Sequence, residues 1–280
     1  MRGLACLMAG LLVALGAGGS AAAAPATRVV ALAPHLAELA WAAGAGDLLV
    51  GAVAWSDYPP PVRALPRVGD AFSIDDERVA ALAPDLVLAW SGGTPPAVIE
   101  RLRGRGFRVE ALASGGLEDV ADHLRAIGRW TGRDAIAQAA ADEFLAGLGA
   151  LARAREGRER VRVFYQISAD PLYTVGGDQV ITRILELCGG RNIFADLESL
   201  AAVVDVEAVV ARDPQVILAA AGAGEGLARW HAWKGLAAVR HGNLFRVDGD
   251  LVSRPSPRLL EGARAVCGHL DSARARISGR

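Results

Sequence analysis

The chain has 280 residues, of which 52% are hydrophobic and 22% charged, and its formal net charge is −1 at pH 7. Its 30 basic residues are spread among 31 acidic ones without forming a basic stripe, so nucleic acid is not an expected partner. A single hydrophobic core rarely grows to this chain length, which favours two lobes or domains.

Residues 1–24 have the pattern of a secretory signal peptide. Met1 and Arg2 precede an apolar run from Gly3 to about Gly16, and small residues suited to signal peptidase follow in "GAGGSAAAA". The run is too short to span a bilayer. A lipoprotein signal at Cys6 is the alternative, but the apolar stretch follows this cysteine instead of preceding it. We therefore expect a periplasmic protein.

Export also determines the expected state of the cysteines. Cys6 would leave with the signal peptide, so the mature chain keeps the pair Cys188 and Cys267. An even pair in an oxidising compartment is expected to form a disulfide. Two separate buried thiols are the alternative.

In chain order, apolar runs typical of strands alternate with stretches typical of helices. The strand-like runs are "RVVALAP", "LLVGAVA", "DLVLAW" and "FRVEAL" before residue 113, and "RVRVFYQI", "PQVILAAAG" and "NLFRVDGD" after residue 158. This alternation predicts an α/β fold of two Rossmann-like lobes, each an open and mostly parallel sheet.

An internal repeat supports two related halves. Residues 75–92, "DDERVAALAPDLVLAWSG", align without gaps with residues 205–222, "DVEAVVARDPQVILAAAG", and eight of the 18 positions are identical. Each copy predicts a short helix, a proline, a buried strand, and a glycine loop at the carboxyl end of that strand.

A long helix is predicted between the halves, in "GRDAIAQAAADEFLAGLGALARAREG", after a cap at Asp134. One face would consist of Ile136, Ala140, Phe144, Leu148 and Leu151. About 24 helical residues would span about 36 Å, the size of a lobe. The basic stretch at 151–162 fits the end of this helix better than a binding patch. The predicted division is 25–130 for the first lobe, 131–158 for the linker helix and 159–280 for the second lobe.

Large aromatic residues follow several of the predicted strands. In open α/β sheets ligands bind beyond the carboxyl ends of the strands. Those ends hold Trp55 with Tyr58, Trp90 in "AWSGG", Tyr173 in "PLYTVGG", and the segment "GDLVSRPSPR". We expect these loops to form a ligand cleft between the lobes, since rings offer flat apolar area. Ordinary packing is the alternative for each ring. It is the expected role of the helical Trp41, Trp130, Trp230 and Trp233.

Four motifs then point to a known family. "SDYPP", "ERVAALAPDLVLAWSGG", "LELCGGRNIF" and "SRPSPR", in this order and with a long helix between the halves, resemble the class III periplasmic binding proteins of ABC importers for cobalamin and metal chelates. The resemblance covers nearly the whole mature chain, and "LELCGGRNIF" with "AWSGG" favours the cobalamin branch. It implies capture of a corrinoid between two lobes and delivery to a permease dimer. It also implies no chemistry, no cofactor, and a monomer when free.

The resemblance also implies roles for individual residues. Trp55 would lie against the corrin ring, Trp90 and Tyr173 would be further cleft aromatics, and the ligand's polar rim would meet Asp250, Leu251, Val252, Ser253 and Arg254. Cys188 and Cys267 match the family's disulfide. Glu77 and Glu207 match acids that meet arginines on the transporter. Their alternative role is to favour the first turn of their own helices.

Some positions depart from the family pattern. Phe72 is the nearest ring where the family has a tryptophan, a second family tryptophan falls near Ala201, and Ser253 replaces an acid. His35 is a weak candidate for a metal ligand, and a place in a helix cap is the simpler interpretation.

Two alternative functions stay open from the sequence. One is a haem or ferric-siderophore receptor of the same fold, for which His35, Tyr58 and Tyr173 are the candidate axial ligands. The other is a secreted α/β enzyme. The sequence has no G-x-S-x-G, H-E-x-x-H or P-loop motif, and "GAGEG" at 222–226 lacks the dinucleotide spacing. We therefore do not expect an enzyme.

Overall fold

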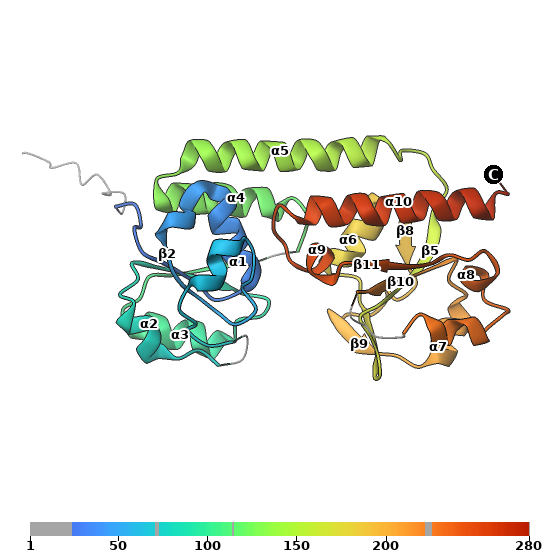
Figure 1. The fold of residues 1–280 in the computed structure, drawn as a ribbon, viewed down its shortest axis with the longest axis horizontal. Coiled ribbons are helices and arrows are strands. Elements are labelled where there is room, and N and C mark those ends of the chain that lie inside the picture. Colours follow the sequence, from blue (N-terminus) through green and yellow to red (C-terminus); the bar gives the residue numbers. More distant parts are fainter. Residues whose placement is uncertain (1–23, 71–72, 114, 222–225, 280) are drawn as a thin grey trace, which may run out of the picture.

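The structure, a computed structural model, describes residues 24–70, 73–113, 115–221 and 226–279. Residues 1–23 of the expected signal peptide and the candidate Phe72 lie outside these ranges. Two α/β lobes stand side by side, and one long helix runs along the same side of both (Figure 1). The predicted fold class is confirmed.

The first lobe is built on a four-stranded parallel sheet in the order β2-β1-β3-β4. Its strands are β1 (Val29–Ala31), β2 (Leu49–Ala52), β3 (Leu86–Trp90) and β4 (Val109–Leu112). Its helices are α1 (Pro34–Ala40), α2 (Asp76–Ala81), α3 (Pro96–Gly104) and α4 (Asp119–Thr131). Alternate residues of β3 belong to two separate cores, one on each face of the sheet. Burial on both faces explains why the strands read as continuous apolar runs.

The second lobe has its own four-stranded parallel sheet, in the order β11-β10-β5-β8. Its strands are β5 (Val161–Gln166), β8 (Gly190–Asn192), β10 (Val216–Ala220) and β11 (Leu244–Val247). Its helices are α6 (Val180–Leu187), α7 (Val206–Arg212), α8 (Ala237–Arg240), α9 (Gly249–Ser253) and α10 (Leu259–Ile277). Read as β8-β5-β10-β11, the order is the same as β2-β1-β3-β4 in the first lobe, so the two sheets share one topology.

The sequence repeat is also visible in the backbone. Asp75 and Asp205 occupy equivalent N-cap positions, and their carboxylates accept backbone N–H bonds at the start of α2 and α7. After each helix, the equivalent residues Ala83 and Asp213 adopt left-handed conformations, with φ of 44° and 40°. The predicted short helix and buried strand are present in both copies.

The connecting helix α5 spans Asp134–Arg153, inside the range predicted for the linker. Its buried residues are Ala137, Ala141, Phe144 and Leu148, whereas Ile136 is 52% exposed. The predicted face was therefore partly wrong, because α5 packs on α4 and α10 through small residues. A Cβ on Gly147 would lie 2.3 Å from Leu260 of α10. The predicted cap was also wrong, since Asp134 is the first helical residue. We retain the division at 131 and 158 as a proposal.

Two features of the second lobe differ from the sequence-based expectation. A small antiparallel sheet, in the order β6-β7-β9, was not predicted. Its strands are β6 (Ser168–Ala169), β7 (Leu172–Val175) and β9 (Ala201–Val203). In addition, the segment expected to be a loop at 249–253 forms the short helix α9, which the Asp248 carboxylate caps.

The predicted disulfide is confirmed. Cys188, at the end of α6, is bonded to Cys267 in the middle of α10, and the two residues are 79 positions apart in the sequence. Both cysteines are fully buried. The bond therefore ties the last helix of the chain to the body of the second lobe.

Candidate functional site

Trp55 and Trp90 meet at one pocket of the first lobe. The pocket has a volume of about 120 Å³ and lies beyond the carboxyl ends of β1, β2 and β3. Its lining residues are Leu32, Ala33, Pro34, His35, Val53, Ala54, Trp55, Trp90, Gly93 and Thr94. Two of the predicted cleft aromatics thus come together where the sheet topology places ligands.

The Trp55 side chain is unusually open to solvent, with 82% of its surface exposed. Its backbone is left-handed, with φ of 66°. For a bulky residue this conformation costs about 1–3 kcal/mol and persists only where the surroundings hold it. Backbone strain of this kind clusters at active sites and ligand clamps, and the exposed indole offers a flat apolar surface to a ligand.

Trp90 is held by the two glycines that follow it. A Cβ on Gly93 would lie 2.1 Å from Cε3 of the Trp90 indole, and one on Gly92 would lie 2.9 Å from its Nε1. The Thr94 hydroxyl accepts a hydrogen bond from the Trp90 N–H at 3.1 Å. The glycines of "AWSGG" are therefore required by the close approach of the ring.

Substituting Gly93→Ala is expected to displace the Trp90 ring, since the new methyl group cannot share its space. Affinity for the ligand of this pocket should fall about tenfold or more, the equivalent of about 1.4 kcal/mol. The matched control is Gly104→Ala, because a Cβ at Gly104 meets nothing within 4 Å. Equal ligand affinity of the Gly93→Ala and Gly104→Ala proteins would contradict the assigned position of the ring.

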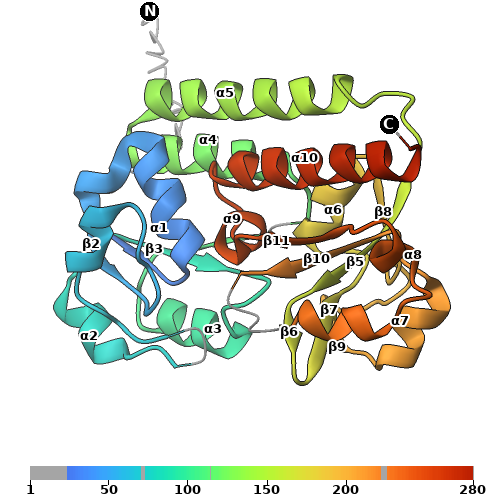
Figure 2. The same ribbon diagram turned by 45° about the vertical axis from the view of Figure 1, so that its right-hand side comes forward.

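Tyr173 lies in the second lobe, on β7 of the small sheet, and is 37% exposed. It pairs across the strands with Val203 of β9, which is 57% exposed, so both side chains stand on one apolar face of the sheet. Leu200, 47% exposed, precedes the same strand. The small sheet lies on the edge of the second lobe nearest the first lobe (Figures 1 and 2). Val203 and Leu200 were not predicted, because β9 is short and has no clear alternation.

Arg254 reaches from the second lobe into the first. Its guanidinium forms ion pairs with Glu38 at 3.1 Å, Asp57 at 2.7 Å and Asp250 at 2.8 Å. It also donates to the Trp55 carbonyl at 3.4 Å. Only 13% of the Arg254 side chain is exposed, and the neighbouring carboxylates raise the pKa of its guanidinium despite the opposing effect of burial. Arg254 therefore fixes the loop that presents Trp55.

Glu38 of α1 is the buried centre of this contact between the lobes. Its side chain is 2% exposed, and besides Arg254 it accepts a hydrogen bond from the Ser256 hydroxyl at 2.6 Å. Arg258 approaches it at 3.5 Å and also covers the Tyr58 ring, at 3.9 Å from the ring centroid. This role could not be predicted, because Glu38 is a single acid in a short, mostly apolar helix.

The other four residues predicted in this segment, 250–253, differ in how far they are buried. Asp250 and Ser253 are exposed, and Leu251 is partly buried. Val252 has no exposed surface and packs in the main core, so its side chain anchors α9 and faces no open cleft.

His35 lines the pocket but is only 4% exposed. Its ring stands edge-on to Trp90, with 5.2 Å between ring centroids. Burial, with smaller contributions from the nearby His123 and Arg254, lowers the pKa of His35 to about 3. The imidazole is therefore neutral at pH 7. Within the described residues no group of three or more His, Cys, Asp or Glu side chains is placed to hold a metal ion.

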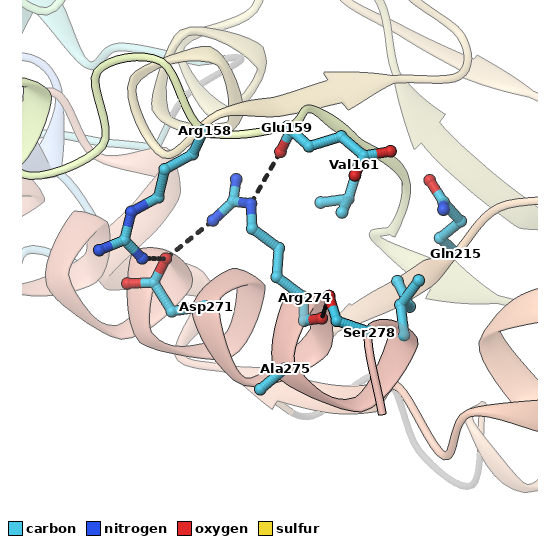
Figure 3. A pocket seen from close by; sticks show the side chains of 9 residues that line it. Arg158, Glu159, Val161, Gln215, Asp271, Arg274, Ala275 and Ser278 are labelled. Atoms are coloured by element: carbon cyan, nitrogen blue, oxygen red, sulfur yellow. Dashed lines mark hydrogen bonds and ion pairs between the residues drawn. The ribbon is translucent and has the colours of Figure 1, made fainter. Parts of the chain in front are cut away.

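A larger cavity, of about 480 Å³, lies at the far end of the second lobe. Asp271 of α10 forms ion pairs with Arg158 at 3.1 Å and Arg274 at 2.8 Å (Figure 3). It forms a third ion pair with Arg155 at 2.7 Å. Arg274 also donates to the carbonyls of Glu159, Cys188 and Gly189. These contacts fasten the segment after α5 to α10. The basic stretch at 151–162 was expected to end the linker helix, but α5 ends at Arg153, and Arg155 and Arg158 beyond it pair with Asp271.

Comparison with known proteins agrees with this geometry. The model of the periplasmic binding protein family matches residues 29–251. The vitamin B12-binding protein of Vibrio cholerae is 36% identical over 250 residues, covering 89% of this chain and 91% of that protein. The vitamin B12-binding protein of Pectobacterium carotovorum is 35% identical over 269 residues, covering 95% of each chain.

Solved structures give the same result. The crystal structure of the periplasmic vitamin B12-binding protein of Vibrio cholerae superposes with a TM-score of 0.85 and 36% identity, over 89% of this chain and 98% of that one. A periplasmic haem-binding protein from Pseudomonas aeruginosa superposes with a TM-score of 0.75 and 27% identity, over 87% and 92%. The chain therefore belongs to the family of periplasmic binding proteins and is not an enzyme.

Proposed function

We propose that this protein captures a corrinoid between its two lobes and delivers it to an ABC transporter. The observation that carries the proposal is the placement of Trp55 and Trp90 at one pocket, with the Trp55 ring largely exposed and its backbone carbonyl bonded by an arginine of the opposite lobe. A broad, flat macrocycle needs apolar walls of this kind. The two relatives named as vitamin B12-binding proteins support the corrinoid class over other metal chelates.

We assign the walls of the cleft as follows. Trp55, Trp90 and Phe72 would contact the ligand from the first lobe, and Tyr173 from the second, next to the exposed Val203. Asp250, Leu251 and Ser253 would meet the polar rim. Arg254 would act mainly by holding the Trp55 loop, because its donors are already engaged by three carboxylates. The corrinoid is cargo in this scheme and no resident cofactor is needed.

Glu77 and Glu207 are proposed to dock the protein onto a permease dimer. Both are exposed, and neither forms an ion pair within the described part of the chain. Asp75 and Asp205 cap the two helices, and Glu77 and Glu207 follow in the first turns, where their charge would also favour the helix dipole. Helices α2 and α7 lie on the side of the molecule opposite α5, one in each lobe (Figure 1). Two separated carboxylates on one side can fix the orientation of docking. We propose that the protein acts as a periplasmic monomer.

Isothermal titration with cyanocobalamin tests the function. We expect one ligand per chain with sub-micromolar affinity. Absence of heat at high micromolar concentration would contradict the proposal. A haem titration in parallel, with a shift of the Soret band as the readout, would identify the haem receptor alternative, for which Tyr58 (42% exposed) and Tyr173 (37% exposed) are the accessible candidate ligands.

A further inference from the structure

Two residues that line the Trp55 pocket each have a buried polar atom that finds no hydrogen-bond partner among the described residues. These atoms are Nε2 of His35 and Nε1 of Trp90. Leaving such a group unpaired costs about 1–3 kcal/mol, so most buried polar groups in folded proteins are paired. The His35 and Trp90 rings are in contact, which places both unpaired residues on the same side of the pocket.

The chemistry of the pocket limits what it can receive. The indole N–H of Trp90 can only donate, so it requires an acceptor, while a neutral imidazole Nε2 can accept or donate according to its tautomer. No lining residue is charged. Arg254, whose charge acts on His35, is already paired with Glu38, Asp57 and Asp250. A carboxylate would therefore enter the pocket without compensation, whereas a primary carboxamide offers an acceptor and a donor and has no charge.

The size of the pocket agrees with this chemistry. Its volume is about 120 Å³. Pockets that hold whole drug-sized ligands are about 300–1,000 Å³, so this one can take a small side group and not the macrocycle itself.

We propose that this pocket receives one peripheral acetamide group of the bound macrocycle, with His35 Nε2 and Trp90 Nε1 as its hydrogen-bond partners. This inference rests on the proposed function and makes His35 a residue that selects corrinoids with an intact amide at that position. His35 would bind as a neutral imidazole, so its contribution would not depend on pH near neutrality.

The test compares the wild type with His35→Phe by urea unfolding and by titration with cyanocobalamin. The phenyl ring keeps the shape and the contact with Trp90 but removes the unpaired nitrogen. We expect the free His35→Phe protein to be at least as stable as the wild type, and its affinity for cyanocobalamin to be about tenfold lower, the loss of one hydrogen bond. His35→Gln, which restores a polar group, should recover part of that affinity. If His35 had only a structural role, its replacement by Phe would not lower the affinity for cyanocobalamin while leaving the stability of the free protein equal or higher.

The matched control is His123→Phe. His123 of α4 is also buried, with an unpaired Nδ1 and a pKa lowered by burial, but it does not line the pocket. Its replacement should leave the affinity for cyanocobalamin unchanged.

Monocarboxylic derivatives of cyanocobalamin, in which one peripheral amide is hydrolysed, provide a second readout. The wild type should bind one of the isomers at least tenfold more weakly than cyanocobalamin, and His35→Phe should discriminate less. If the wild type binds cyanocobalamin and His35→Phe binds it equally well, the acetamide pocket is wrong. If the wild type itself does not bind cyanocobalamin, the proposed function fails independently of His35.

Discussion

Replacing Arg254 by methionine is expected to destabilise the protein by about 3 kcal/mol or more, because breaking a buried ion pair leaves a carboxylate without its partner. Glu38 is 2% exposed, and it would keep only the Ser256 hydroxyl at 2.6 Å and the more distant Arg258. The affinity for cyanocobalamin should fall at least tenfold as well. The Trp55 loop would lose its contacts with Arg254. Ligand binding would then have to order this loop, which costs free energy and lowers affinity.

Urea unfolding and calorimetric titration measure the two effects of this change. Arg183→Met is the control, because Arg183 pairs only with exposed carboxylates of Asp178 and Glu186, and such pairs are worth less than about 1 kcal/mol. Glu38→Gln tests whether the ion pair affects affinity by positioning the Trp55 loop. Because Glu38 is buried and does not contact the ligand, a lower affinity of this variant would come from the displaced Arg254 and not from a lost ligand contact. An Arg254→Met protein with the stability and affinity of the wild type would contradict the proposed link between the lobes.

Removing the disulfide is the second change with a large expected effect. In the chain-entropy model a loop of 79 residues stabilises the folded state by up to about 4.5 kcal/mol. The Cys188→Ala/Cys267→Ala protein should therefore unfold at a markedly lower urea concentration. Because the bond joins α6 to α10 far from the Trp55 pocket, the folded variant should bind cyanocobalamin as the wild type does.

Reduced wild-type protein is the control for lost packing in this experiment, since it has both sulfurs but no covalent bond. It should unfold between the oxidised wild type and the double alanine variant. Coincident unfolding curves for the oxidised and reduced proteins would show that the bond does not constrain the unfolded chain.

The parallel sheets could be predicted from the sequence because their strands are buried on both faces. Runs such as "DLVLAW" and "PQVILAAAG" have no polar residue in the strand core, and the repeat placed them in equivalent positions. The small sheet could not be predicted in this way. Its strands have two to four residues, and its pairing depends on long-range contacts such as that between Tyr173 and Val203.

The pocket residues were predicted only in part. Trp55 and Trp90 could be identified because rare large rings follow predicted strands. The contact of Glu38 with Arg254 could not be predicted, since 216 positions separate the two residues. No local sequence pattern indicates which residue pairs with a single acid in a mostly apolar helix. The assignment of Arg254 to the polar rim of the ligand stays a prediction, but its ion pairs with Glu38, Asp57 and Asp250 could not be foreseen from the sequence.

A co-crystal structure with cyanocobalamin tests the central claim most directly. We predict a corrin ring between the lobes, against Trp55 and Trp90 on one side and near Tyr173 on the other. A ligand bound elsewhere, or a corrin that touches only one lobe, would contradict the account.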